Sequence, residues 1–488
     1  MQVTIILAFC LFNGRLGVNF LEILNLSPMK KIIYLLLLAP LFGLSQVSQP
    51  SNADAVFIKK VSDEILTNGK AYDLLFELTK KVGGRIAGSP AMYKAEAWGE
   101  KTLQQLGAPS VSKQACQVPR WVRGSGDFAS ITSVDGAKQT RALDVLALGN
   151  SLGDGKKVEA TLLAVQDFDE LEKRKDEVKG KIVYFNNSFD ATLVKTFEAY
   201  GKAGIYRRSG PSQAAKYGAV GCIIRSLTSS TANDPHTGGM AYNDSFPKIP
   251  AQAVGPRDAD YLWSLAKKSS AVKISMATHG KFLADTTGHN IIAEIKGSQF
   301  PNEIITVGGH LDSWDVNEGA HDDGAGIVQT MEVLRTMKAL NYQPKHTIRF
   351  VLFANEENGM RGGNKYADLA KENKEQHIFA LESDEGGFTP RGFSFTASPE
   401  KVAAAKRWLP LLKPYGTDSM DDIGGGSDIS PLNRQLQVPL CGFMPDPQRY
   451  FDLHHARTDV FENVNKRELL LGAVNIAGII YLVDTYGF

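Results

Sequence analysis

The segment that decides the fold reads Ile304-Ile-Thr-Val-Gly-Gly-His310-Leu-Asp312. Its first four residues are apolar or β-branched, which predicts a strand buried on both faces of a parallel sheet. Two glycines then lead into a histidine and an aspartate. In an open α/β sheet the functional crevice lies beyond the carboxyl ends of the strands. The segment therefore predicts a functional site at that edge of the sheet.

The same pattern recurs along the C-terminal half of the chain. Residues 347–353 and 378–381 are nearly continuous apolar runs, and a helix with apolar residues at three-residue steps is predicted between 327 and 337. Such alternation predicts an α/β fold with a mixed, largely parallel sheet flanked by helices. Carboxylates follow these two strands as well, as Glu356-Glu357 and as Glu382-Ser-Asp384.

Two further groups carry metal-binding side chains. Asp322-Asp323-Gly324 precedes the predicted helix, and His454-His455 follows a predicted strand at 440–444. Each group alone has an ordinary structural explanation, such as a helix N-cap. Imidazole nitrogens and carboxylate oxygens are, however, the ligands that zinc accepts, and five such groups converge on one sheet edge. Their joint occurrence predicts a metal site.

Together these motifs resemble family twenty-eight of the zinc metallopeptidases, the co-catalytic aminopeptidase-type enzymes with a zinc exopeptidase (phosphorylase/hydrolase-like) fold. The motifs that carry the resemblance are His310-x-Asp312, Asp322-Asp323-Gly324, Glu356-Glu357, Glu382-Ser-Asp384 and His455-x-x-x-Asp459. Gly84-Arg85-x-x-Gly88-Ser89 resembles the N-terminal signature of that family. Residues 308–315 and 425–428 resemble a carboxypeptidase subgroup within it. The resemblance covers nearly the whole chain after the first 46 residues.

The resemblance implies a pair of zinc ions held by five side chains. The expected ligands are His310 and Asp384 for one ion, Glu357 and His455 for the other, and Asp322 as a bridge between them. Asp312 is expected to accept the second ring N–H of His310, the usual support for a ligating histidine. Either His454 or His455 could be the ligand, and the spacing to Asp459 in the family favours His455.

Glu356 is the predicted general base. Adjacent residues leaving a strand point in opposite directions, so Glu356 and Glu357 are not expected to perform the same task. One binds metal, while the other takes a proton from the attacking water and hands it to the leaving amine. The resemblance implies that the glycine-rich turn at 424–428 lies near the substrate, with Ser427 or Asp428 as candidates to hold a substrate amine, and a plain turn is the alternative.

Between about residues 124 and 283 the texture changes to short apolar runs separated by Gly, Asp and Asn. This pattern predicts a mostly β module with one or two helices. Residues 178–183 resemble an inserted protease-associated domain, which implies a lid or a substrate-access module, and a passive spacer is the alternative. The predicted catalytic domain then comprises residues 47–123 and 284–488, on either side of the insert.

Composition limits the partners and the compartment. The 488 residues suit two domains, and 54 basic against 53 acidic residues leave a net charge of +1, with no basic excess for nucleic acid. Residues 1–46 are predicted to be an upstream extension and a signal peptide that begins at Met29, with an apolar run at 32–42 too short to span a membrane. Cys116, Cys222 and Cys441 show no metal or redox spacing, and one disulfide stays open.

The sequence thus predicts a secreted or periplasmic dizinc exopeptidase that hydrolyses dipeptides or short peptides, with no membrane span after signal cleavage. The subgroup resemblance favours dipeptidase or carboxypeptidase action, and the wider family favours aminopeptidase action. A non-catalytic, receptor-like binding protein on the same fold is the alternative from another class. The sequence also permits a homodimer.

Overall fold

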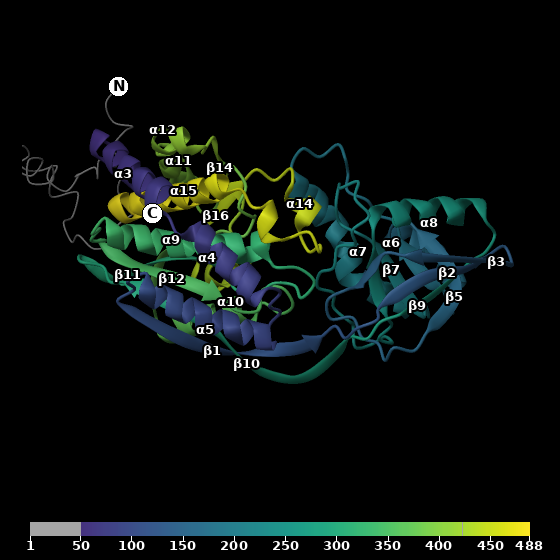
Figure 1. Cartoon of the computed structure of the whole chain (residues 1–488). Coiled ribbons are helices and arrows are strands. Elements are labelled where there is room, and N and C mark those ends of the chain that lie inside the picture. The colour runs from purple at the N-terminus through teal and green to yellow at the C-terminus, as the bar shows by residue number, and fades with distance from the viewer. Residues whose placement is uncertain (1–49, 422) are drawn as a thin grey trace, which may run out of the picture. The chain divides into compact units, whose positions relative to one another are not determined.

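A computed structural model describes residues 50–421 and 423–488, so the predicted signal peptide lies outside the described residues (Figure 1). The described residues contain two eight-stranded sheets. The first sheet has the strand order β1 (Ser110–Val122), β10 (Lys281–Ile295), β12 (His346–Phe353), β11 (Phe300–His310), β13 (Gln376–Glu382), β16 (Leu440–Pro445), β14 (Pro390–Thr396) and β15 (Ser419–Asp421).

The centre of the first sheet is parallel and its flanks are largely antiparallel. Strands β12, β11, β13 and β16 run parallel, whereas β10 pairs antiparallel with β12, and β14 pairs antiparallel with β16. Val307 of β11 lies opposite Phe350 and Leu381 in its two neighbours, and all three side chains are buried. The predicted mixed α/β fold is confirmed. Because the central strands are parallel, their carboxyl ends meet at one edge.

Helices cover both faces of this sheet. One core contains α3 (Asn52–Asn68), α4 (Ala71–Glu77), α9 (Ala325–Ala339) and α15 (Lys466–Tyr486) together with alternate residues of β11 and β12. The other core contains α10 (Arg361–Glu372) and α13 (Ser430–Leu436) with the intervening strand residues, such as Val351. Strand side chains alternate between the two faces, so apolar runs without polar interruption are what a doubly covered sheet requires.

Helix α15 is long and apolar enough to cross a membrane, but 78% of its apolar window is buried inside the protein. It packs against α3 and α9, and is therefore a core helix of the described residues.

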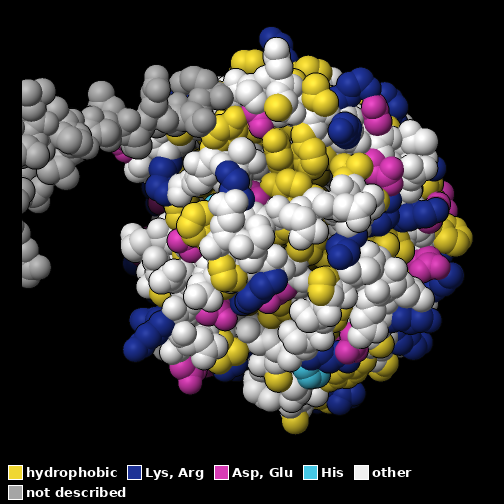
Figure 2. Space-filling view, turned by 90° about the vertical axis from the view of Figure 1, so that its left-hand side faces the viewer, with side chains coloured by type: hydrophobic (Ala, Val, Ile, Leu, Met, Phe, Trp, Pro, Cys, Tyr) yellow, Lys and Arg dark blue, Asp and Glu magenta, His cyan; other side chains and the backbone are white. Residues whose placement is uncertain are grey.

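On the face of the molecule shown in Figure 2, hydrophobic side chains gather near the centre, and acidic and basic side chains are interspersed around them.

The second sheet lies within the region predicted to be an insert. Its order is β3 (Ala137–Leu143), β2 (Phe128–Val134), β9 (Val272–Ala277), β5 (Val158–Val165), β6 (Ile182–Phe185), β7 (Gly221–Arg225), β8 (Ala251–Val254) and β4 (Val145–Ala147). The chain enters and leaves it through β1 and β10, which pair from Ser110–Glu294 to Val122–Lys281. That these residues form a protease-associated domain stays a prediction.

The region that contains the second sheet has more helices than the sequence predicts. Three α-helices occur between residues 124 and 283, namely α6 (Phe168–Lys173), α7 (Thr196–Lys216) and α8 (Pro256–Lys268). Helix α7 is 21 residues long, but its buried positions are mostly small, such as Ala199, Ala203 and Gly210, and Pro211 lies inside it. Such a helix has almost no hydrophobic periodicity, which is why the pattern of apolar residues did not reveal it. Cys116, Cys222 and Cys441 are buried free thiols.

Candidate metal centre and its pocket

The first half of the site lies at the end of β11. His310 is the last residue of that strand, and Asp384 follows the end of β13, the parallel neighbour. The Nε2 atom of His310 lies 3.2 Å from an Asp384 Oδ1 and 3.2 Å from an Asp322 Oδ1. Asp322 comes from the turn that leads into α9. These three side chains therefore face one point.

The second half of the site is built on the other oxygen of Asp322. The Nε2 atom of His455 lies 3.2 Å from Asp322 Oδ2 and 3.2 Å from Glu357 Oε2. Glu357 follows β12, and His455 follows the short helix α14 (Tyr450–Leu453). The structure thus brings all five predicted ligands together, with Asp322 between the two histidines.

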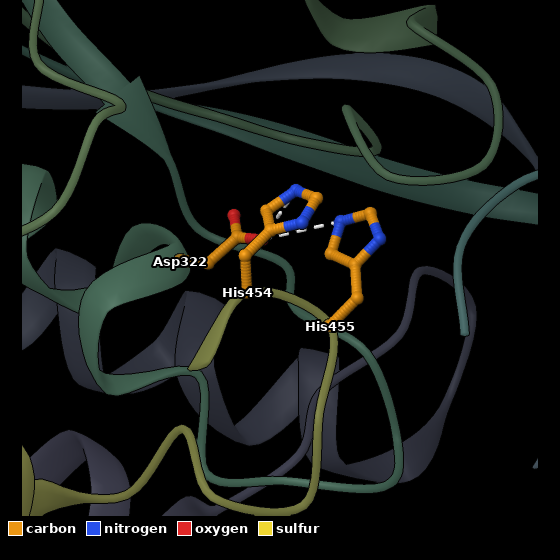
Figure 3. A group of neighbouring side chains, drawn as sticks. All are labelled: Asp322, His454 and His455. Atoms are coloured by element: carbon orange, nitrogen blue, oxygen red, sulfur yellow. Dashed lines mark ion pairs between the residues drawn. The ribbon is translucent and has the colours of Figure 1, made fainter. Parts of the chain in front are cut away.

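The two adjacent histidines are not equivalent. Figure 3 shows both rings beside the carboxylate of Asp322, but the Nε2 atom of His454 lies 3.6 Å from Asp322 Oδ2, and no ion pair of this ring with Glu357 occurs among the described residues. His455 has a φ of 61°, in the left-handed region that non-glycine residues rarely adopt. The geometry of His455, rather than that of His454, matches the position predicted for the ligand.

Burial makes this concentration of carboxylates unfavourable. Glu357 is buried, and burial together with the charge of Asp322 raises the pKa of Glu357 well above its usual value. Burial lowers the pKa of His310, but Asp384, Asp312 and Asp322 more than offset this effect and raise it well above normal. Buried carboxylates that repel one another are stabilised when a cation lies between them.

Several donor atoms are placed to bind a metal ion rather than to form hydrogen bonds with one another. Asp322 Oδ2 and Glu357 Oε1 are buried and have no hydrogen-bond partner in the described part of the chain. Asp322 Oδ2 is 3.2 Å from Nε2 of the His455 ring, but the pair lacks hydrogen-bond geometry. Two groups, His310–Asp322–Asp384 and Asp322–His454–His455, each have their ligand atoms within 4.8 Å. Imidazole and carboxylate donors in this arrangement suit zinc.

Glu356, the predicted general base, lies beside the ligands and faces the same pocket. Its backbone N–H donates to Asp312 Oδ1 at 2.9 Å, which fixes the turn after β12. Burial raises the pKa of the Glu356 carboxyl to about 7. A carboxylate with a raised pKa is a better proton acceptor than an ordinary glutamate.

Asp312 supports the site differently from the prediction. The ring Nδ1 of His310 is 2.9 Å from the main-chain oxygen of Asp312, whereas the nearest carboxylate oxygen is 3.7 Å away. The carboxylate instead accepts the backbone N–H groups of Glu356 and Glu357. Asp312 is only two residues beyond His310, so its carbonyl reaches the ring while its side chain extends to the neighbouring turn.

The two residues predicted to bind a substrate amine differ in their access to the pocket. Ser427 lines the pocket, but Asp428 is completely buried and does not line it. Asp428 therefore lies out of reach of a substrate in this structure, contrary to expectation. The sequence places Asp428 only one residue from Ser427, but the turn before α13 directs the two side chains differently.

Asp459 belongs to the last motif quoted from the sequence, but its supporting role was not predicted. Asp459 is buried, and its two oxygens accept the backbone N–H groups of His321 at 2.7 Å and of Asp322 at 3.2 Å. Burial raises the pKa of the Asp459 carboxyl to about 7. The ring of His321 stacks on Phe388, away from the ligands, in agreement with a purely structural role. The position of Asp459 at the end of the His455 motif was the available signal.

The ligands open onto a cavity of about 630 Å³. One side of this cavity is formed by Glu356, Asp384 and His455, and another by residues of the second-sheet region, including Tyr200 and Arg207 of α7. A pocket of this size with convergent polar groups suits a small peptide.

Comparison with known proteins places this geometry in a family. The profile of Peptidase family M28 matches residues 290–479. Carboxypeptidase Q of Mus musculus is 34% identical over 415 residues, which cover 85% of each chain. Carboxypeptidase Q of Xenopus laevis is 36% identical over 401 residues, 81% of this chain and 82% of the relative.

Solved structures agree with these matches. A Peptidase M28 precursor from Shewanella amazonensis is 31% identical, has a TM-score of 0.84, and covers 89% of this chain and 97% of its own. BSAP, a zinc aminopeptidase from Bacillus subtilis, shares the fold at 21% identity and a TM-score of 0.61, over 85% of this chain and 94% of its own. The resemblances predicted from the motifs, to the family and to its carboxypeptidase Q subgroup, are confirmed. The chain is a peptidase, and it belongs to peptidase family M28.

Proposed function

We propose that this protein is an exported dizinc exopeptidase that hydrolyses dipeptides or short peptides. The observation that carries the proposal is the placement of the Asp322 carboxylate, with one oxygen 3.2 Å from His310 and the other 3.2 Å from His455. Carboxypeptidase and aminopeptidase activities in the names of the relatives support exopeptidase action. The zinc named for the Bacillus subtilis structure supports the choice of ion.

The ligand assignment follows the two halves of the site. His310 and Asp384 would hold one zinc ion, His455 and Glu357 would hold the other, and Asp322 would serve both. The ions supply Lewis acidity, which polarises the scissile carbonyl and acidifies the attacking water. Asp312, Asp323 and Asp459 hold the ligands in place through backbone N–H groups, including that of His310, which donates to Asp323 Oδ2 at 3.0 Å.

Glu356 moves the proton in this proposal. Its carboxylate lines the pocket beside Glu357, and the hydrogen bond of its backbone to Asp312 keeps it from turning away. It accepts a proton from the attacking water and delivers it to the leaving amine as the peptide bond breaks. One residue thus serves as base and then as acid, and the proton count balances.

Metal analysis and a dipeptide assay of one variant test this proposal. Glu356→Gln should retain the zinc content of the wild type and lose activity by about 10³-fold or more, because the ligands are untouched while proton transfer is lost. Glu372→Gln, an exposed glutamate on α10, is the matched control and should keep full activity. A Glu356→Gln protein that cleaves dipeptides at the wild-type rate would contradict the assignment.

The direction of attack is tested with blocked substrates. Cleavage that survives N-acetylation of a peptide supports carboxypeptidase action, whereas cleavage lost on N-acetylation supports aminopeptidase or dipeptidase action.

Export, proposed from the segment that begins at Met29, is tested by the N-terminal sequence of the protein recovered from outside the cytoplasm. A chain that still begins at Met1 or Met29 would contradict signal cleavage.

A further inference from the structure

A second cavity, which we call the side cavity, adjoins the cavity of the metal centre. Its volume is about 490 Å³. Phe197 of α7 lines both cavities. Asp384, one of the proposed ligands, lines the first cavity, and the next residue, Glu385, lines the side cavity. Because the Cα atoms of consecutive residues are about 3.8 Å apart, the side cavity begins within one residue of a proposed ligand.

Most of the wall of the side cavity is apolar. Phe197 contributes its ring, and Met444 and Pro445 contribute the end of β16. Ile423 also lines the cavity, and 87% of its side chain is exposed, so the cavity is open to solvent on that side. Walls of this kind can pack against the methylene groups of a long side chain, including one that ends in a charge.

Glu385 brings an unpaired acid into these apolar surroundings. Its side chain is partly buried, and its carboxylate forms no hydrogen bond or ion pair with any side chain or main-chain group of residues 50–421 and 423–488. Burial, and then the charge of Asp384, raises the pKa of Glu385 to about 8. A carboxylate in such a position is stabilised when a cation lies beside it.

The basic side chains of the side cavity are already paired with other acids. The Nζ atom of Lys195 lies 3.2 Å from Asp421 Oδ2, and the NH2 group of Arg391 lies 2.7 Å from Asp446 Oδ2. Glu198 lines the cavity as well, but it is exposed, and its carboxylate is unpaired in the described part of the chain. Two unpaired acids therefore remain, and the side cavity is complementary to a positive charge.

We infer that Glu385 binds the cationic end of a substrate side chain, so that the enzyme prefers peptides with lysine or arginine beside the scissile bond. The inference rests on the proposed function, because it takes the scissile bond to lie at the proposed zinc ligands. The aliphatic part of a basic side chain would pack on Phe197 and Met444, while its charged end would pair with the carboxylate. An apolar side chain of similar length would leave the acid without a partner.

Dipeptides that contain either lysine or norleucine test the inference. Norleucine has a straight aliphatic side chain but carries no ammonium group. Two pairs of dipeptides, with the test residue before or after alanine, cover both sides of the scissile bond. In at least one pair the lysine dipeptide should have a kcat/KM at least about ten-fold higher, as expected for one charge-assisted pair. Norleucine dipeptides that are cleaved as well as or better than the lysine dipeptides in both pairs would overturn the inference.

Variants of the two unpaired acids separate Glu385 from the general negative charge of the side cavity. Glu385→Gln should abolish the preference for lysine, and Glu385→Asp, which keeps the charge on a shorter side chain, should retain part of it. Glu198→Gln removes the same charge from the exposed acid and should reduce the preference less than Glu385→Gln does. Glu372→Gln, exposed on α10, is the matched control outside the cavity and should leave the preference unchanged. A preference that is lost in Glu198→Gln but kept in Glu385→Gln would show that the assignment to Glu385 is wrong.

The outcomes distinguish this inference from the proposed function. If the wild type cleaves the lysine and norleucine dipeptides with equal kcat/KM, the inference is wrong while the proposed peptidase stands. If it cleaves none of them and retains no zinc, the proposed function itself is wrong. The zinc content of Glu385→Gln is measured as well, because Glu385 adjoins Asp384. Should this variant lose zinc or fail to fold, the comparison of lysine with norleucine in the wild type still decides.

Discussion

At the scale of single residues, the carboxylate of Asp322 organises the site. Its oxygens face His310 and His455 at the same distance of 3.2 Å, and its backbone N–H is held by Asp459. The imidazole of His310 lies beside Asp322 and Asp384, and the imidazole of His455 lies beside Asp322 and Glu357, so the site contains two similar groups of candidate ligands. A structural ion pair would need only one of these two groups.

The adjacent histidines provide a matched pair of variants. We expect His455→Phe to lose about one equivalent of zinc per chain and nearly all activity, because Nε2 of His455 faces both Asp322 and Glu357. We expect His454→Phe to keep the zinc, since a phenyl ring preserves the packing against Tyr200 and Phe451. Metal analysis of the two purified variants checks this. The reverse result would identify His454 as the ligand.

At this scale the sequence predicted the five candidate ligands, which follow strands or flank a helix, and it missed Arg207. His310, Glu357 and Asp384 were predictable because buried strands are visible as apolar runs and their ends define an edge. Arg207 was not, since its approach to His455 depends on how α7 packs, and no local pattern encodes that contact. The acceptor for the His310 ring was mistaken because a main-chain oxygen leaves no trace in side-chain identity.

At the scale of elements, Arg85 fastens the loop between β11 and α9. This buried guanidinium donates to three main-chain oxygens of that loop, those of Leu311, Glu318 and Gly319. Arg85→Met should lower the free energy of unfolding by about 3 kcal/mol, because three buried carbonyls lose their donor. Urea unfolding measures this, with the exposed Arg467→Met as control. A loss no larger than that of the control would exclude the structural role.

A second element-scale prediction concerns the ion network across β10, β12 and β13. Hydrogen bonds from His377 and Arg349 lower the pKa of Glu375 to about 2, although its partial burial opposes them. A carboxyl whose pKa is depressed on folding adds stability above its ordinary pKa near 4.5, and that stability is lost as the pH falls towards 2.

Glu375→Gln should therefore be less stable than the wild type by about 2 kcal/mol at pH 7, with the gap closing between pH 4.5 and pH 2. Unfolding free energies measured across this pH range test the sign. A gap that widens as the pH falls would contradict the account. Glu372→Gln, which is exposed on α10, should show no such gap at any pH.

The elements themselves were predicted unevenly. The central strands and the helices α9 and α15 follow from long apolar patterns, which are the primary sequence signal for secondary structure. Strands β14 and β15 extend the sheet beyond β16, and β14 pairs antiparallel with β16. No sequence pattern predicted that arrangement. Helices were predicted between residues 124 and 283, but α7 could not be placed because its buried face consists largely of alanine and glycine.

At the scale of the whole molecule, the two sheets contribute to one cavity. Ligands come from the edge of the first sheet, while Tyr200, Arg207 and Met240 come from the region of the second. The proposed ligands thus lie on one wall of the cavity, and side chains from the region of the second sheet lie on the other.

Metal removal should destabilise the whole molecule. Without cations the buried carboxylates of Asp322, Glu357 and Asp384 repel one another, so chelation should lower the Tm by about 5 °C or more, and zinc should restore it. Calorimetric scans with and without chelator check this. Magnesium, which prefers oxygen ligands, should not substitute. A Tm that is insensitive to chelation would mean that the fold does not depend on bound metal.

The central claim is that five side chains hold a pair of zinc ions, and anomalous diffraction at the zinc edge from a crystal of the protein tests it most directly. The account predicts two peaks per chain, one among His310, Asp322 and Asp384 and one among Asp322, Glu357 and His455. No peak at these side chains, or a single peak that leaves either histidine without an ion, would contradict it.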